Sequence, residues 1–308
     1  MLIPAYGVAH LLGEALASLL AQGFQDWEAI VVDDGAPDDV AGAFAAYAHD
    51  PRFRLLQTDN GGPSVARNRA AAAARAPLLA MLDGDDAYAP DYLARMVATI
   101  DADPAIGLVA CDAMMFGAPP HAGRLYSSLY PMDGPATLER VISRDTAIYT
   151  AVLLRRAAFR QVGGFDPTIG WGEDLDLWIR LLAAGWRAQV LCEPLARYRR
   201  RSGSLTTRPR DLLAGMCAVY RKTGRALEGR PEAEAARCAL ERCERELRWL
   251  DGQSAILGGD IRRGLALLSG VEHSSLRWRI ALPVMRRAPR LAGLLLRARS
   301  WLPRPRRA

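Results

Sequence analysis

The stretch PLLAMLDGDDAYAP, residues 77–90, decides the fold class of this chain. It opens with a short apolar run without polar alternation, which is typical of a strand buried on both faces. Three carboxylates, Asp83, Asp85 and Asp86, follow within four positions. A buried strand that ends in clustered acids indicates an open α/β sheet, in which ligands bind beyond the carboxyl ends of the strands.

The same arrangement occurs earlier, in WEAIVVDDG at residues 27–35, where a second apolar strand ends at Asp33 and Asp34. Before it lie the strand LIPAY and the segment HLLGEALASLLAQ, whose apolar residues recur at helical spacing. A strand, a helix and a strand in this order predict a right-handed crossover and a parallel sheet. Both acidic clusters should then face one crevice. The alternative is that these acids are turn residues, since Asp and Gly are favoured in turns.

Strands and helices alternate as far as about residue 208, and the rest of the chain reads as helical. In GGPSVARNRA, residues 61–70, Ser64 is the expected N-cap of a helix. The predicted C-terminal helices lie near residues 210–226, 231–249, 254–269 and 275–300. We therefore expect an α/β domain over 1–208 and a helical region over 209–308, with the boundary near Pro209.

The acidic strand end predicts a divalent cation, Mg²⁺ or Mn²⁺. Mg²⁺ takes hard oxygen ligands, only one or two of them from the protein when phosphate and water supply the others. Such an ion neutralises a diphosphate leaving group. The helix beginning near Gly61 and its Arg67 favour an anion as well. The alternative for that helix is a surface helix with solvated arginines. These residues alone predict metal-assisted chemistry on a phosphorylated ligand.

A second acidic pair, Glu173 and Asp174, opens the predicted helix in GWGEDLDLWIRL, residues 170–181. A carboxylate there could take the proton of a hydroxyl nucleophile. The alternative is that both are ordinary first-turn acids, which the helix dipole stabilises.

The motifs IPAY, WEAIVVDDG, GGPSVARNRA, MLDGDDAY and GWGEDLDLWIRL, in this order, resemble the family 2 glycosyltransferases, over about residues 1–208. The resemblance implies the GT-A fold, a Rossmann-like, mixed and mainly parallel sheet flanked by helices. It also implies an inverting enzyme that moves a sugar from a nucleotide-diphosphate donor, of the UDP or dTDP type, to a hydroxyl of a glycan or lipid-linked acceptor in cell-surface polysaccharide or glycoconjugate synthesis. The segment 117–136, rich in Pro and Gly, is a candidate acceptor loop.

On the donor side, the resemblance assigns the nucleoside base to the loop from Pro4 to Tyr6 and to Asp34. It places Arg67 beside the base and the phosphates, and Asp83 near the ribose.

On the metal and acceptor side, the resemblance makes Asp85 of the DxD motif the metal ligand. It makes Asp174 the catalytic base, with Glu173 beside it; which of these two is the base stays open. The family often has a metal-ligating histidine in the loop that here reads YRRRSGSLT, with Arg200 and Arg201. Arginine cannot ligate a cation but binds phosphate with its planar fork. We therefore expect both arginines to bind the nucleotide sugar. The missing histidine also motivates an alternative function, a catalytically inactive, membrane-associated binding subunit with a GT-A-like fold.

Charge and composition indicate where the protein works. From Arg277 to the end there are ten arginines and no acid, although the whole chain carries only +6. Because Leu and Trp alternate with them, this tail is typical of an amphipathic helix on an anionic membrane surface and not of a nucleic-acid interface. The alternative is a helix packed on the catalytic domain with its arginines in water. The five cysteines form no CxxC pair, and no signal peptide or membrane span is readable. We expect a cytoplasmic protein that is peripheral on the inner membrane face.

Overall fold

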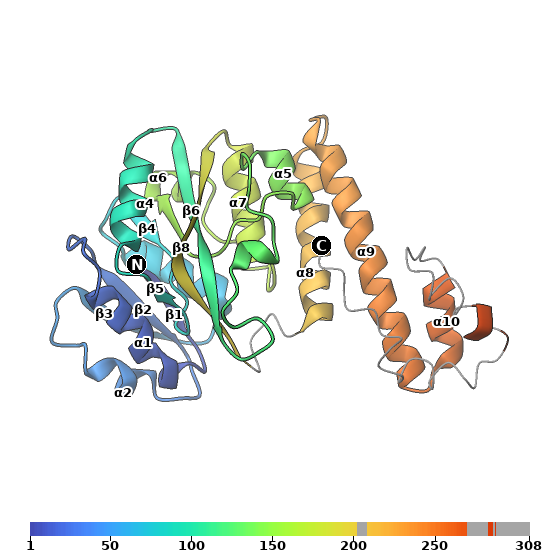
Figure 1. Ribbon diagram of the computed structural model, residues 1–308, viewed down its shortest axis with the longest axis horizontal. Coiled ribbons are helices and arrows are strands. Elements are labelled where there is room, and N and C mark those ends of the chain that lie inside the picture. The colour runs from blue at the N-terminus through green and yellow to red at the C-terminus, as the bar shows by residue number, and fades with distance from the viewer. Residues whose placement is uncertain (202–207, 270–282, 286, 288–308) are drawn as a thin grey trace.

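The computed structural model describes residues 1–201, 208–269, 283–285 and 287 (Figure 1). One sheet contains β1 (Leu2–Ala5), β2 (Ala29–Asp34) and β3 (Phe53–Thr58), in that order and all parallel. The other contains, in spatial order, β4 (Leu78–Ala80), β7 (Val152–Arg155), β6 (Ile106–Gly117), β8 (Arg187–Arg200) and β5 (Ala87–Tyr88). A parallel bridge between Leu2 and Met81 joins the two sheets.

The strand directions make the sheet mixed. β6 and β8 are parallel, whereas β7 runs antiparallel to both its neighbours and β5 runs antiparallel to β8. The predicted α/β class is therefore confirmed, and parallel pairing dominates only in the first sheet.

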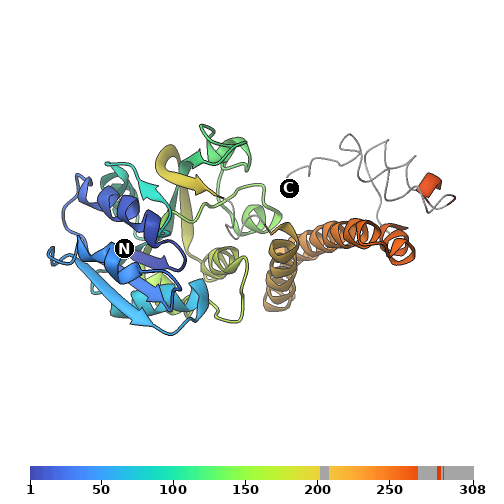
Figure 2. The ribbon, with the colours of Figure 1, turned by 90° about the horizontal axis from the view of Figure 1, so that it is seen from below.

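Helices flank these sheets on both faces, as Figure 2 shows for the N-terminal part. They are α1 (Ala9–Leu20), α2 (Val40–Ala45), α3 (Gly62–Ala73), α4 (Tyr92–Asp101), α5 (Leu138–Ser143), α6 (Arg156–Gln161) and α7 (Glu173–Ala183). Side chains alternate between the two faces of the sheet along β2, so this strand contributes to the apolar core on both faces. Ile30 and Val32 pack into the core on one face, and Val31 packs into the core on the other.

The N-terminus of α3 differs from the expectation. The helix begins at Gly62 with Gly61 as its N-cap, so the prediction of Ser64 as N-cap is wrong. The carboxylate of Asp34 accepts hydrogen bonds from the backbone N–H groups of Gly61 and Gly62, at 2.9 and 2.8 Å. A carboxylate at the end of β2 thus satisfies backbone donors at the helix start, which a serine cap would have done locally.

Three further helices follow: α8 (Pro209–Ala226), α9 (Glu232–Leu257) and α10 (Ile261–Ser269). Met216 and Tyr220 of α8 belong to the same apolar core as Trp178 of α7. Lys222 of α8 also pairs with the buried Asp176 of α7, at 2.8 Å. α8 therefore packs directly on the α/β fold, while the far end of α9 extends away from it with α10 alongside (Figures 1 and 2).

The predicted interruption between residues 249 and 254 is wrong, because α9 continues to Leu257. Gly252 lies inside this helix, and a Cβ there would lie 2.7 Å from the side chain of Leu268 in α10. Glycine at this position permits close packing of two helices and does not end the first one. The domain boundary near Pro209 coincides with the start of α8 and stays a prediction.

Most of the helix predicted over 275–300, with the basic tail, lies outside the described residues. Over the described ranges, no helix combines the length and the apolar character needed to span a bilayer.

Candidate active site

The acidic turn from Asp83 to Asp86 lies against the end of β1. Within the turn, the backbone N–H of Asp86 donates to the carbonyl of Asp83 at 3.0 Å. At Gly84, a Cβ would lie 3.0 Å from both the carbonyl oxygen of Pro4 and the side chain of Val8. Only glycine permits this approach without displacing the neighbours. The approach sets the acids beside the predicted base-binding loop, whose Tyr6 is half exposed.

Asp86 fixes the acidic turn to the second sheet. One of its carboxylate oxygens accepts from the Tyr149 hydroxyl at 2.6 Å and the other from the backbone N–H of Arg199 in β8 at 2.8 Å. Burial, together with repulsion from Asp83 and Asp85, raises the pKa of Asp86 well above its ordinary value. With both oxygens engaged inside the protein, Asp86 has a structural function.

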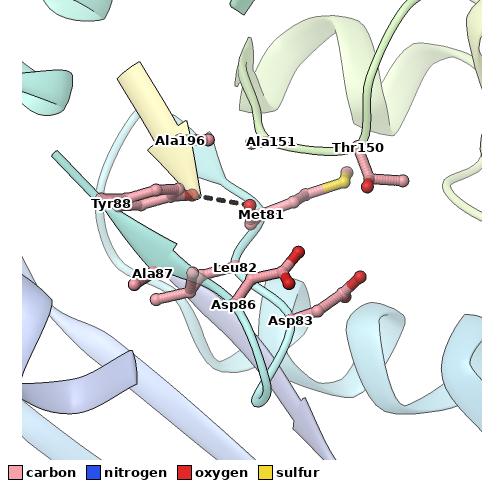
Figure 3. A pocket seen from close by; sticks show the side chains of 9 residues that line it. All are labelled: Met81, Leu82, Asp83, Asp86, Ala87, Tyr88, Thr150, Ala151 and Ala196. Carbon is pink, nitrogen blue, oxygen red and sulfur yellow. Dashed lines mark hydrogen bonds between the residues drawn. The ribbon is translucent and has the colours of Figure 1, made fainter. Parts of the chain in front are cut away.

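Figure 3 shows the small pocket at the base of this turn, where the side chains of Asp83 and Asp86 point to the same side. Thr150 and Ala151 line it from the segment before β7, and Ala196 lines it from β8. The hydroxyl of Tyr88 donates to the carbonyl of Met81 at 2.6 Å and so links the residues on either side of the turn.

Arg67 of α3 joins the two acidic motifs. Its guanidinium is buried and donates to Asp83 at 2.6 Å and to Glu173 at 2.8 Å. The guanidinium also lies 5.4 Å from the centre of the Phe165 ring. Burial alone would lower the pKa of Arg67, but the two facing carboxylates raise it above its ordinary value. Arg67 is therefore a permanent cation that holds the start of α7 next to the acidic turn.

At the start of α7, the neighbouring acids Glu173 and Asp174 make different contacts. Gly172, the N-cap, has φ +77°, a left-handed conformation that glycine adopts without strain. Glu173 is held by Arg67, whereas an oxygen of Asp174 accepts from the backbone N–H of Leu175 at 2.7 Å. Burial, with repulsion from Glu173, raises the pKa of Asp174 to about 6.

Arginines at the end of β8 face Asp85. Arg201 Nε donates to the Asp85 carboxylate at 2.7 Å, and Arg199 Nε donates to the Asp85 carbonyl at 2.8 Å. Burial and Asp83 raise the pKa of Asp85, and Arg201 opposes that rise. Arg200 lies over the ring of Tyr198, 5.5 Å from its centre. Of the two predicted phosphate-binding arginines, Arg201 therefore lies at the predicted metal ligand.

The donor atoms fit a divalent cation that is completed by phosphate. Asp83 and Asp85 offer carboxylate oxygens two residues apart, with side chains 31% and 19% exposed. In the described part of the chain, no group of three or more His, Cys, Asp or Glu side chains could hold an ion alone. Mg²⁺ and Mn²⁺ accept such sparse protein ligation when a diphosphate and water supply the other ligands.

The predicted base-binding residues lie at the ends of the first two strands. Asp34 is 3% exposed, and its carboxylate caps α3, so its side chain is directed at the protein backbone. The structure thus brings Arg67 into direct contact with Asp83 and Glu173. Asp174 directly follows Glu173 in the sequence, and Asp85 lies two residues after Asp83.

A cluster of four tyrosines, which the sequence analysis did not single out, lies beside the acidic turn; we call it the tyrosine cluster. It consists of Tyr126, Tyr130, Tyr149 and Tyr198. The ring centre of Tyr126 lies 4.7 Å from that of Tyr130 and 4.9 Å from that of Tyr149. The segment 117–136, predicted as the acceptor loop, supplies two of the rings. No sequence motif around Tyr149 or Tyr198 indicates that they belong to this cluster, because only the packing of the sheet brings the segment before β7 and strand β8 to the other two rings.

Comparisons with known proteins decide the family. The family model described as glycosyl transferase family 2 matches residues 1–163. The chain is also 32% identical, over 266 residues, to the succinoglycan biosynthesis protein ExoU of Rhizobium meliloti (strain 1021), an alignment that covers 80% of this chain and 75% of that protein. This chain belongs to glycosyl transferase family 2. A second relative in the same organism, the succinoglycan biosynthesis protein ExoO, is 34% identical over 207 residues, which cover 64% of this chain and 58% of that protein.

Solved structures agree with the family 2 assignment on the fold. S. aureus TarS 1–349 in complex with UDP-GlcNAc matches with a TM-score of 0.63 at 20% identity, covering 96% of this chain and 88% of that one. The mannosyltransferase PcManGT from Pyrobaculum calidifontis, in complex with GDP-Man and Mn²⁺, matches with a TM-score of 0.62 at 20% identity, covering 96% and 82%. The predicted family, the GT-A fold and glycosyltransferase activity are confirmed.

Proposed function

We propose that this family 2 enzyme transfers a sugar, with inversion, from a UDP-type or dTDP-type nucleotide sugar to a hydroxyl of a glycan or lipid-linked acceptor in the synthesis of a cell-surface polysaccharide. The observation that carries the proposal is the contact of Arg67 with both Asp83 and Glu173, because it couples the acidic turn to the acids at the start of α7. The names of ExoU and ExoO support polysaccharide synthesis, and the UDP-GlcNAc complex of TarS supports a UDP-sugar.

In the proposed mechanism, Asp174 accepts the proton of the acceptor hydroxyl while that oxygen attacks the anomeric carbon of the donor. The bond from the anomeric carbon to the diphosphate breaks on the opposite side, and the configuration inverts. Glu173 is less suited to this step, because its carboxylate is already engaged by the guanidinium of Arg67 at 2.8 Å. A pKa of about 6 leaves Asp174 ionised at neutral pH and still basic enough to accept a proton.

On the donor side, Asp85 would hold the divalent cation, with Asp83 beside it near the ribose. The cation, when bound, neutralises the diphosphate and makes it a better leaving group. Arg201, already at Asp85, and Arg200 would bind phosphate oxygens. Pro4, Tyr6 and Asp34 remain our proposal for the base-binding side.

Donor hydrolysis by the full chain tests this function. With Mn²⁺ present, a panel of UDP- and dTDP-sugars should contain one that is turned over. We expect Asp174→Asn to lower that rate by about 10²–10⁴-fold, the contribution of a general base, without weakening UDP binding. Asp85→Asn should weaken UDP binding in the presence of Mn²⁺. The matched control is Asp101→Asn, an exposed acid of α4, which should change neither quantity. A wild-type rate in Asp174→Asn would contradict the mechanism.

The same experiment separates the enzyme from the alternative, an inactive binding subunit. UDP binding without turnover of any donor would favour the alternative. The proposed peripheral location on the cytoplasmic membrane face rests on the basic tail, which lies outside the described residues.

A further inference from the structure

The tyrosine cluster has an arginine at one edge, Arg144. This residue is the C-cap of α5 and has φ +66°. That is the left-handed region, in which residues other than Gly and Asn are uncommon. Glycine would relieve this strain at a helix end. A long charged side chain at such a position suggests that the side chain itself has a function.

Among the described residues, Arg144 forms no ion pair, although the carboxyl of Asp174 lies within electrostatic range of it. Its guanidinium lies 5.8 Å from the centre of the Tyr130 ring and donates to the sulfur of Met216 at 3.4 Å. In the described part of the chain, no carboxylate pairs with it. By contrast, Arg180 and Lys222, on the neighbouring helices α7 and α8, both pair with the buried Asp176. A partly buried guanidinium without a carboxylate partner attracts an anion more strongly than a solvated one.

The tyrosine cluster and Arg144 lie on the acceptor side of the proposed reaction. Tyr149 donates to Asp86 of the acidic turn at 2.6 Å, so one end of the cluster touches the donor region. At the other end, Arg144 is close enough to Asp174 to lower the pKa of that carboxyl, against the larger effect of burial. The acceptor hydroxyl must reach Asp174, and both Arg144 and Tyr126 lie within electrostatic range of that carboxyl, so an acceptor bound there lies next to this cluster.

We propose that Arg144 binds an acidic group of the acceptor, a carboxylate or a phosphate, while a sugar ring of the acceptor lies on the tyrosine cluster. Tyrosine rings offer an apolar face and a polar hydroxyl, which suits a sugar. The fork of Arg144 matches the planar pair of oxygens in a carboxylate or phosphate. The assignment to the acceptor rests on the proposed function, whereas the preference for an acid rests on Arg144 alone.

Binding of three small probes tests this site, measured by saturation-transfer NMR on the full chain with UDP and Mn²⁺ added. The probes are methyl β-D-glucuronide, glucose 6-phosphate and the neutral methyl β-D-glucoside. We expect at least one acidic probe to bind about tenfold more tightly than the neutral one, the size of a charge-assisted contact. The first two probes distinguish a carboxylate from a phosphate. Equal binding of all three probes would overturn the proposal.

Variants of Arg144 complete the test. Arg144→Met should lose the preference for an acid, and Arg144→Lys, which keeps the charge, should keep part of it. Arg221→Met is the matched control, because Arg221 is an exposed arginine of α8 that pairs with Glu244, and it should keep the full preference. An acid preference that survives in Arg144→Met would refute the site, and if that variant does not fold, the wild-type preference and the lysine variant decide.

A separate titration with UDP keeps this inference distinct from the proposed function. If UDP does not bind but the acidic probe does, and the preference depends on Arg144, the donor assignment fails and the anion site stands. If UDP binds and no probe prefers Arg144, the proposed function stands and this inference fails.

Discussion

Replacement of Arg67 by methionine tests the bridge between the two acidic motifs. Methionine keeps much of the apolar volume but leaves Asp83 and Glu173 without their cation. The side chain of Glu173 is 14% exposed, so we assign about 2 kcal/mol to its charge-assisted contact. That of Asp83 is 31% exposed and partly screened by water, so we assign about 1 kcal/mol. The expected loss is therefore about 3 kcal/mol in the free energy of unfolding, the lower limit for breaking a buried ion pair.

Urea unfolding of four proteins provides the measurement: wild type, Arg67→Met, Glu173→Gln and the double variant. Glu173→Gln alone should cost about 1 kcal/mol, since Arg67 keeps Asp83 as a partner. In the double variant no uncompensated charge remains at Glu173, so its loss should be smaller than the sum of the single losses by about 1–2 kcal/mol.

Two results would refute this reasoning. One is additivity of the single variants within about 0.5 kcal/mol, which would mean that Arg67 and Glu173 act independently. The other is an equal loss in the control Arg69→Met. Arg69 lies on the same helix, but it is 38% exposed and 3.5 Å from Asp34, so it should contribute less than about 1 kcal/mol.

Of four further predictions, two concern the base, one the turn and one the tail. Because burial raises the pKa of Asp174 to about 6, kcat/KM should fall as the pH drops below that value. The same raised pKa makes the ionised carboxyl a cost to the folded state at pH 7 and not at pH 4, so Asp174→Asn should stabilise the protein by about 1–2 kcal/mol at pH 7, and a stability change of opposite sign would contradict this. Gly84→Ala should lower the free energy of unfolding by about 1–3 kcal/mol through its contact with the end of β1, whereas Gly224→Ala, in open space on α8, should be neutral or stabilising by urea unfolding. Binding to anionic liposomes should decrease with salt and be lost on truncation after Leu276, and unchanged binding in that truncation would rule out a membrane role for the tail.

Much of the fold could be predicted because the signals were local. The run AIVV before Asp33 is apolar at every position, and a strand buried on both faces requires that. The helix expected from Glu173 begins at that residue, since Gly172 and three first-turn acids mark the position. The errors occurred where a contact with another element, and not the local sequence, decided the structural role of a residue. A helix break was predicted between 249 and 254, but Gly252 lies inside α9, where α10 packs against it.

The site could be predicted only in part for the same reason. The sequence marks Asp83, Asp85, Glu173 and Asp174 as acids at element ends, since a strand end and a helix start are local patterns. It could not show that Arg67 contacts acids 16 and 106 positions away. It also left open whether Glu173 or Asp174 is the better base, and only the ion pair of Glu173 provides a physical distinction.

The sequence by itself thus determined the family and the order of strands and helices, because each depends on short motifs whose residue types are sufficient, and it predicted the chemistry of the donor side. The tertiary structure decided how charges pair. It pairs Glu173 with Arg67, turns Asp34 into a helix cap, and, among the described residues, places Arg144 beside the tyrosine cluster without an ion pair. The physical reason is that electrostatic interaction depends on distance and burial, and these are set by the packing of segments far apart in the chain.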